Sequence, residues 1–256
     1  MITPFFSAVS VVVMRELIKF VRERGKLLSM IARPLLWLFL VGSGMTRMVS
    51  SDMGMPYIQF IFPGIVGMTV LFSSIFSSIS IIWDKEFGFM KEMLVAPVPR
   101  SAIVVGKALS GTAVSTVQAL IILLVHPFIG LDLSLGQAVG ILLLSALLAF
   151  CLSSLGILIA TFYESFESFS VIMNFIVMPM FFLSGAMYPV RLLPDAVAML
   201  SKLNPLTYGV DALKHLSFRQ PHTTVFDFTL MLDLSVLVIC SFVFVIIGAL
   251  AFERRK

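Results

Sequence analysis

The sequence predicts an all-α membrane protein that crosses the bilayer six times. Three observations support this fold class. Of the 256 residues, 59% are apolar and only 12% are charged, about half the charged fraction of a soluble domain. Five runs of 19 to 31 residues contain no Asp, Glu, Lys or Arg, and about 18 such residues cross a hydrocarbon core as a helix. Basic residues concentrate in alternate connecting segments.

The first predicted element is an interfacial amphipathic helix over residues 8–27. Four basic side chains share a narrow arc of the helical wheel, while Val13, Leu17 and Phe20 face the other way. A helix of this kind lies in the membrane interface. A solvated helix with incidental apolar residues is the alternative, and the segment is too charged for a signal peptide. The basic arc consists of Arg15, Lys19, Arg22 and Lys26.

The six spans follow from the apolar runs. The run of residues 34–46 is short, and it reaches membrane length only if Arg33 and Arg47 extend to opposite interfaces. The remaining runs need no extension or only a small one. The predicted spans are residues 28–49, 57–83, 101–126, 136–160, 168–190 and 230–252, within a single domain that covers residues 1–256.

The basic residues also predict the orientation of these spans. With an inside amino terminus, 13 of the 18 Lys and Arg residues lie in inner segments and 5 lie in outer ones. Positively charged residues near span ends accumulate on the cytoplasmic side. We therefore expect a multi-pass protein of the cytoplasmic (inner) membrane with both termini in the cytoplasm. The net charge of +4 is too small to indicate a nucleic-acid partner.

The inner loop after the second span predicts a short amphipathic helix over residues 84–96. Phe87, Met90 and Leu94 share one helical face, and prolines end the helix. The helix is expected to lie across the cytoplasmic face. A passive connector that rests on lipid headgroups is the alternative interpretation.

The outer loop between spans 5 and 6 predicts short extracytoplasmic re-entrant helices over residues 191–218. Two of its stretches are too apolar for a solvated loop, and Asn204–Pro205 separates them. Gly185 and Pro189 weaken the preceding helix as it approaches the outer interface. We expect these helices to cap the outer side of a pathway. An interfacial loop with no role in a pathway is the alternative.

Small residues within the second span leave two interpretations open. Ser73, Ser77 and Ser80 share one arc of that span. Small side chains at this spacing let helices approach closely, so helix packing is the first interpretation. A polar lining of a pathway is the second.

Several classes of activity find no support in the sequence. No charged residue lies at mid-depth in a span, where coupled transporters place one. No phosphate loop, HExxH or GxSxG pattern occurs, and we expect no catalytic residue and no metal site. The three histidines, His126, His215 and His222, are interpreted as interfacial polar residues. Cys151 and Cys240 lie in apolar runs and predict no disulfide.

Three stretches of the sequence together resemble the membrane subunits of ABC-2 type ATP-binding cassette exporters, particularly the daunorubicin-resistance and nodulation lipo-oligosaccharide branch. They are Arg33–Trp37, the loop of residues 84–100 with Gly106–Lys107 after it, and residues 181–189 leading to residues 204–213. The similarity covers nearly the whole chain. Lys85 departs from the arginine that is usual between the two acids of the loop, a change that preserves the charge.

The resemblance implies a permease subunit of an ATP-driven exporter for an amphiphilic drug, a lipid-linked saccharide or a polysaccharide. It also implies a second permease copy, as a homodimer in the bilayer, and two copies of a separate ATPase subunit that binds ATP and Mg. A stand-alone secondary transporter or channel and a non-transporting membrane scaffold stay open as alternatives. The inner amphipathic helix would be the coupling helix that docks on the ATPase, through Asp84, Lys85, Glu86, Phe87, Met90 and Glu92. The outer gate would comprise Gly185, Pro189, Asn204, Pro205 and Tyr208.

Overall fold

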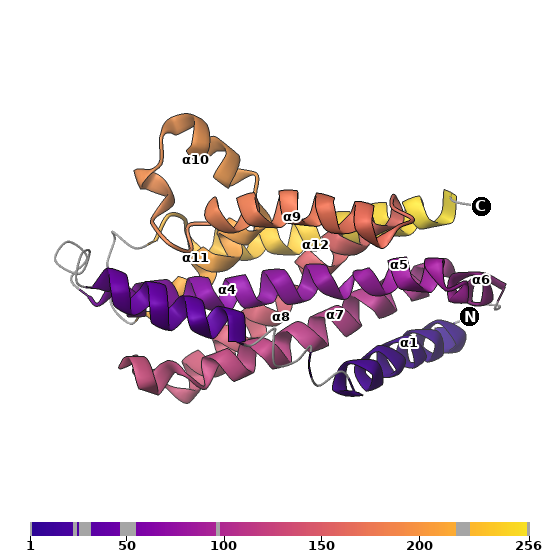
Figure 1. Ribbon diagram of the computed structural model, residues 1–256, viewed down its shortest axis with the longest axis horizontal. Coiled ribbons are helices and arrows are strands. Elements are labelled where there is room, and N and C mark those ends of the chain that lie inside the picture. The colour runs from indigo at the N-terminus through magenta and orange to yellow at the C-terminus, as the bar shows by residue number, and fades with distance from the viewer. Residues whose placement is uncertain are drawn as a thin grey trace.

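The computed structural model describes residues 2–22, 25, 32–46, 55–95, 98–218 and 226–254, and no strand occurs among them. The chain forms an elongated bundle whose long helices run roughly side by side (Figure 1). In chain order the elements are α1 (Ile2–Arg22), η1 (Trp37–Gly42), α4 (Tyr57–Ser77), α5 (Ile79–Glu86), α6 (Phe89–Val95), α7 (Arg100–Leu123), η2 (His126–Ile129), α8 (Leu135–Thr161), α9 (Phe166–Phe182), η3 (Val190–Leu192), α10 (Asp195–Lys202), α11 (Pro205–Ser217) and α12 (Leu230–Arg254).

Among the described residues, four helical stretches are long and apolar enough to cross a membrane. They are Tyr57–Glu86, which joins α4 to α5, Arg100–Leu123, Leu135–Thr161 and Leu230–Glu253. The chain is thus an all-helical, multi-pass membrane protein, as the sequence predicts. The other two predicted spans overlap α9, which has 17 residues and ends at Phe182, before the predicted end at residue 190, and helical residues 32–46. Residues 28–31 and 47–49 lie outside the described residues, so a total of six spans stays a prediction.

The helix α4 forms the centre of the bundle. In its most apolar window 78% of the residues are buried, compared with 17% for α12. α4 packs against α7, α8 and α11, and its apolar side chains meet those neighbours all round, which is the pattern of a helix at the core of a bundle. α12 instead exposes residues such as Phe242, Ile246 and Leu250. This apolar face suits lipid or another membrane helix.

The three serines of the predicted arc lie in different surroundings. Ser77 faces the close approach of α7 at Gly111, and the hydroxyl of Ser80 accepts a hydrogen bond from Lys107 Nζ at 2.9 Å. Ser73 is buried and lines a cavity. The arc therefore combines helix contacts with one position on a cavity wall.

The two ends of the bundle carry different short elements. α6, the start of α1 and the end of α12 lie at one end, whereas α10 and α11 lie toward the other (Figure 1). The predicted helix over residues 84–96 is interrupted at Gly88, whose φ of 82° breaks the α-helical path. Phe87 follows α5 and Met90 belongs to α6, so the two do not share one helical face as the periodicity predicted.

Candidate coupling surface

Four charged residues form an alternating cluster where α1, α5 and α7 meet. Asp84 Oδ2 lies 2.8 Å from the guanidinium of Arg15 and 2.5 Å from Lys107 Nζ. Glu16 Oε1 lies 2.7 Å from Lys107 Nζ and 2.8 Å from the same guanidinium. Each acid therefore touches both bases, and the charges within this four-residue cluster cancel. We call these four residues the charge cluster.

Burial makes the pairing within the charge cluster important. The side chain of Lys107 is only 2% exposed, and a buried charge without a partner costs several kcal/mol. Burial by itself raises the pKa of Glu16, but Lys107 and Arg15 outweigh it and hold that pKa below its ordinary value. Desolvation opposes the charge on Arg15, yet its bonds to Glu16 and Asp84 raise its pKa. Both groups are therefore ionised at neutral pH.

Lys85 makes a second connection from α5 into the bundle. Its Nζ donates to the carbonyl oxygens of Ala160, Thr161 and Tyr163 at 2.9, 3.0 and 2.9 Å. These carbonyls belong to the carboxyl end of α8, where a cation satisfies unpaired acceptors and complements the helix dipole. The arginine that is usual at this position in the resembling family would supply the same charge.

The six predicted coupling residues divide into an inward and an outward set. Asp84, Lys85 and Met90 point into the protein, and Met90 is only 6% exposed. Glu86, Phe87 and Glu92 are exposed. The outward residues together with Phe89 form what we call the exposed knob. Its two aromatic side chains, Phe87 and Phe89, are 71% and 52% exposed.

A cleft of about 220 Å³ separates the exposed knob from α1. It is lined by Arg15, Glu16, Lys19, Trp83, Asp84, Phe87 and Phe89. Lys19 Nζ lies 4.4 Å from the centre of the Trp83 ring, a cation–π contact across the cleft wall. Arg22 is exposed near the end of α1, and Lys26 lies outside the described residues. A surface with exposed aromatics above buried ion pairs has the composition of a protein-docking site.

The predicted outer gate lies toward the opposite end and is extensively hydrogen-bonded. Asn204 accepts a bond from the N–H of Leu206 and donates to the Met180 carbonyl at 2.7 Å, and Pro205 occupies the first turn of α11. Tyr208 donates to the Lys202 carbonyl at 2.7 Å.

Gly185 and Pro189 belong to the turn between α9 and η3. Gly185 has a φ of 74°, and its carbonyl accepts a bond from Lys214 Nζ at 2.8 Å. Pro189 is buried and precedes η3. The turn and α11 are thereby tied together.

Two further acids hold the segments around α11 in place. Asp227 accepts bonds from the N–H groups of Val190 and Arg191 at 3.0 and 3.1 Å. Asp211, on α11, accepts from the N–H groups of Asp227 and Phe228 at 3.0 and 2.9 Å. These bonds fasten the segment before α12 to α11 and to η3. No sequence pattern singled out Asp211, Lys214 or Asp227.

A second cavity, of about 320 Å³, lies farther along the bundle. Thr69, Ser73, Gln118 and the guanidinium-bearing Arg33 supply its polar lining, and apolar and aromatic side chains supply the rest. Arg33 lies 5.4 Å from the centre of the Phe72 ring. The complete lining is Arg33, Pro34, Thr69, Phe72, Ser73, Phe76, Ile79, Trp83, Gln118 and Phe166.

Comparison with known proteins identifies the class to which this architecture belongs. Residues 7–218 match the ABC-2 type transporter family, and the chain belongs to that family. The resemblance stated from the sequence motifs is therefore confirmed.

Individual relatives are similar to the chain over most of its length. The chain is 31% identical over 216 residues to the putative transport permease ycf38 of Cyanophora paradoxa, which covers 83% of this chain and 74% of the relative. It is 27% identical to the inner membrane transport permease YadH of Escherichia coli K12, over 70% of each chain. It is also 27% identical to nodulation protein J of Rhizobium meliloti, over 77% of this chain and 76% of the relative. Two of these three relatives are thus named as transport permeases.

Proposed function

We propose that this chain is the permease subunit of an ATP-driven exporter and that two copies of it assemble with two ATP-binding cassette ATPase subunits. ATP and Mg bind to the ATPases, because this sequence has no phosphate loop. Membership of the ABC-2 type family supports this assignment. The α6 end faces the cytoplasm of the inner membrane, with both termini there, which the distribution of basic residues supports.

The observation that carries the proposal is that the exposed knob lies beside the charge cluster. Phe87 and Phe89 present apolar surface to a partner. Directly behind them, Asp84 and Lys85 join α5 to α1, α7 and α8 through ion pairs and hydrogen bonds. α5 also continues into α4 at the bundle centre. A push on the knob is therefore transmitted to several helices together, as a rigid-body movement requires.

The opposite end then closes the exit on the extracytoplasmic side. α11 is buried between α4, α8 and α12. Lys214 on α11 bonds to Gly185 in the turn after α9, and Asn204, the residue before α11, bonds to Met180 within α9. Opening the exit would need these contacts to separate together. The α4–α5 helix carries Asp84 of the charge cluster and packs against α11. Its movement would therefore link the two ends.

The substrate class that we propose is an amphiphile, such as a drug, a lipid-linked saccharide or the lipid-bearing end of a polysaccharide. The cavity of about 320 Å³ supports this class because it combines aromatic walls with Arg33, Ser73 and Gln118. Apolar lining with few polar groups is the usual composition of a site for such molecules.

The first test removes a knob side chain. Phe87→Ala and Glu86→Ala are compared with Asp132→Ala, an exposed acid distant from the knob. Insertion should change little, because exposed substitutions usually cost within about 0.5 kcal/mol. Loss of an interface anchor costs at least about 2 kcal/mol, roughly a thirtyfold weaker association. The measurements are permease level and recovery of a P-loop ATPase, identified by mass spectrometry, after mild-detergent purification. Full recovery of the ATPase with both knob variants would show that this segment is a passive connector.

The second test concerns orientation. In a background lacking Cys151 and Cys240, Glu92→Cys and Lys202→Cys should react with an impermeant thiol reagent from opposite sides of the membrane. Only Lys202→Cys should be labelled from outside in intact cells. Labelling of both positions from the same side would overturn the proposed topology.

A further inference from the structure

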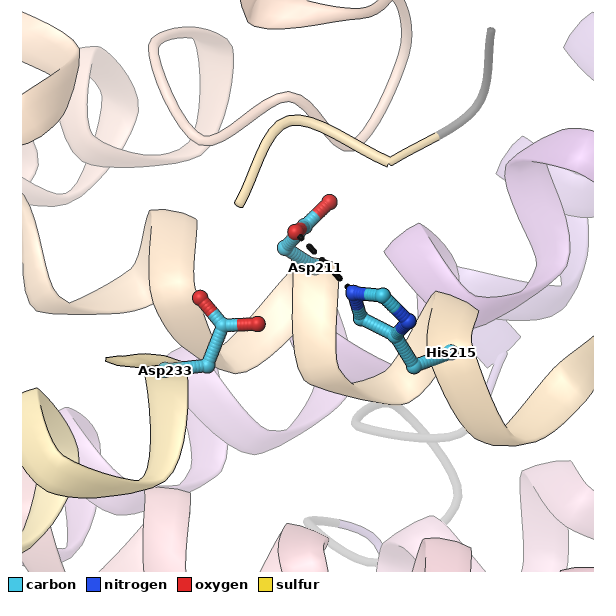
Figure 2. Close-up of side chains that lie close together, drawn as sticks. All are labelled: Asp211, His215 and Asp233. Carbon is cyan, nitrogen blue, oxygen red and sulfur yellow. Dashed lines mark ion pairs between the residues drawn. The ribbon is translucent and has the colours of Figure 1, made fainter. Parts of the chain in front are cut away.

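Two carboxylates and an imidazole meet near the outer end of α11, away from the coupling surface. Asp211 and His215 lie one turn apart on α11, and Asp233 lies in the first turn of α12. One ligand atom from each lies within 4.8 Å of the other two. Figure 2 shows the three side chains converging from the two helices.

Asp233 is the member of this group whose carboxylate lacks hydrogen-bond partners among the described residues. The residue is 0% exposed, and neither carboxylate oxygen has a hydrogen-bond partner among the described residues. Its carboxylate is turned toward Asp211 and His215 (Figure 2). A buried carboxylate beside a second one requires a compensating cation or a proton.

Neighbouring groups fix the positions of the other two side chains. Both Asp211 oxygens accept bonds from backbone N–H groups at 3.0 and 2.9 Å, which fix the carboxylate while leaving a lone pair on each oxygen. The His215 ring stacks on Phe226 with a centroid separation of 4.0 Å. Its Nε2 lies 3.0 Å from the Phe228 carbonyl oxygen and 3.7 Å from Asp211 Oδ2, so a bound metal ion would replace the contact with Phe228. Such secondary contacts are those that orient metal ligands.

The charge of the buried Lys214 acts on Asp211, but its ammonium is bonded elsewhere. Lys214 Nζ donates to the Gly185 carbonyl at 2.8 Å and lies 4.9 Å from the centre of the Phe60 ring. Its ammonium therefore makes no ion pair with Asp233 among the described contacts.

We propose that Asp211, His215 and Asp233 bind a divalent transition-metal ion, with Zn²⁺ as the preferred occupant. Three atoms within 4.8 Å of one another always have some point that lies no more than about 2.8 Å from all of them, so a contraction brings all three to the 2.0–2.2 Å of zinc ligands. One imidazole with two carboxylates favours zinc over Mg²⁺ and Ca²⁺, which prefer oxygen ligands alone.

The location of the site gives an ion a route of entry and lets a bound ion connect two helices. The His215 side chain is 21% exposed, so an ion can reach the site from the surface. Once bound, it would join α11 to the first turn of α12. The ion would thus act as a clamp on the short helices of this end, whether or not the chain works with an ATPase.

The experiment uses the full chain, purified in mild detergent and treated with a chelator. ZnCl₂ is added, and bound zinc per chain is measured by elemental analysis together with the thermal unfolding temperature. We expect one zinc per chain and a rise of roughly 5–10 °C at a hundredfold excess over Kd. MgCl₂ at the same concentration should give no comparable rise.

Variants separate metal binding from a purely structural role. Asp233→Asn and His215→Gln should weaken zinc binding at least about 100-fold, and Asp233→Asn should unfold no earlier than the wild type without metal, because the amide needs neither a cation nor a proton to compensate it. Asp132→Asn and His126→Gln are the matched controls and should bind normally. Absence of zinc binding by the wild type, or unchanged binding by both site variants, would overturn the proposal, as would preferential binding of Ca²⁺ or Mg²⁺.

Discussion

At the α1–α6 end, two acids face two bases, whereas at the α10–α12 end two acids face each other and an imidazole. The charge cluster satisfies Asp84 with Arg15 and Lys107 at 2.8 and 2.5 Å. Asp211, at the other end, is satisfied by backbone N–H groups, and Asp233 by nothing among the described residues. The first arrangement is complete within the chain, while the second leaves a buried carboxylate that needs a cation or a proton.

This difference agrees with the separate tasks proposed for the two ends. A surface that transmits force needs fixed internal bonds, which the charge cluster and Lys85 provide. An exit has to open, and bonds that depend on a bound ion or on short helices are easier to release than four paired charges. The first two predictions test how strongly the α1–α6 end is fixed.

Lys107→Ala should produce the largest loss of stability. The substitution leaves Asp84 and Glu16 facing each other with only Arg15 to compensate them. Removing one partner of a buried ion pair costs about 3–5 kcal/mol. The measurement is the thermal unfolding of the purified chain. The double variant Asp84→Asn with Lys107→Gln should recover part of the loss, and equal stability of wild type and Lys107→Ala would show that the cluster is not structural.

Lys85→Ala should cost about 2–3 kcal/mol, because bonds that involve a charged group contribute about 1.5–3 kcal/mol. Three carbonyl acceptors near the end of α8 would lose their donor. Lys85→Arg retains the charge and is the matched control. It should keep most of the stability in the same unfolding measurement. A similar loss for both variants would mean that packing of the lysine stem, and not its ammonium, holds α5 to α8.

Acidification should weaken the α1–α6 end through Glu16. Its pKa is lowered in the folded protein, so its contribution is present above the unfolded pKa, 4.5, and is lost as the pH falls through the lower folded value. Glu16→Gln should cost about 1–2 kcal/mol at pH 7, and the difference from the wild type should shrink below pH 4.5. Unfolding curves at pH 7, 5 and 4 test this, and a constant difference would contradict it.

The sequence predicts the long helices well because a run without charges has one stable solution in a bilayer. Leu135–Thr161 lies within such a run, and Arg100–Leu123 and Leu230–Glu253 overlap such runs over most of their length. Position along the chain cannot predict partners far apart in sequence. Arg15 and Asp84 are 69 positions apart, and Glu16 and Lys107 are 91 apart.

Local exceptions explain the remaining differences. Helical periodicity placed Phe87 and Met90 on one face, but the left-handed Gly88 changes the direction of the chain between them. Met90 therefore turns inward while Phe87 stays exposed. Asp233 stands at the edge of an apolar run, where a charge commonly marks the end of a span. Only the arrival of α11 beside it reveals that it is buried.

The smallest expected effect comes from Gly88→Ala, and its counterpart at the other end sharpens the comparison. Gly88 and Gly185 have φ values of 82° and 74°, where a Cβ costs about 1–2 kcal/mol. A Cβ on Gly88 would meet nothing within 4 Å, whereas one on Gly185 would lie 3.0 Å from Val190 Cγ2. Gly88→Ala should therefore cost only the backbone strain, about 1 kcal/mol, and Gly185→Ala should cost more because Val190 must also move. Thermal unfolding of both variants measures the difference. Equal losses would mean that the turn after α9 yields as readily as the exposed turn before α6, and that the tight packing assigned to the outer end does not restrain it.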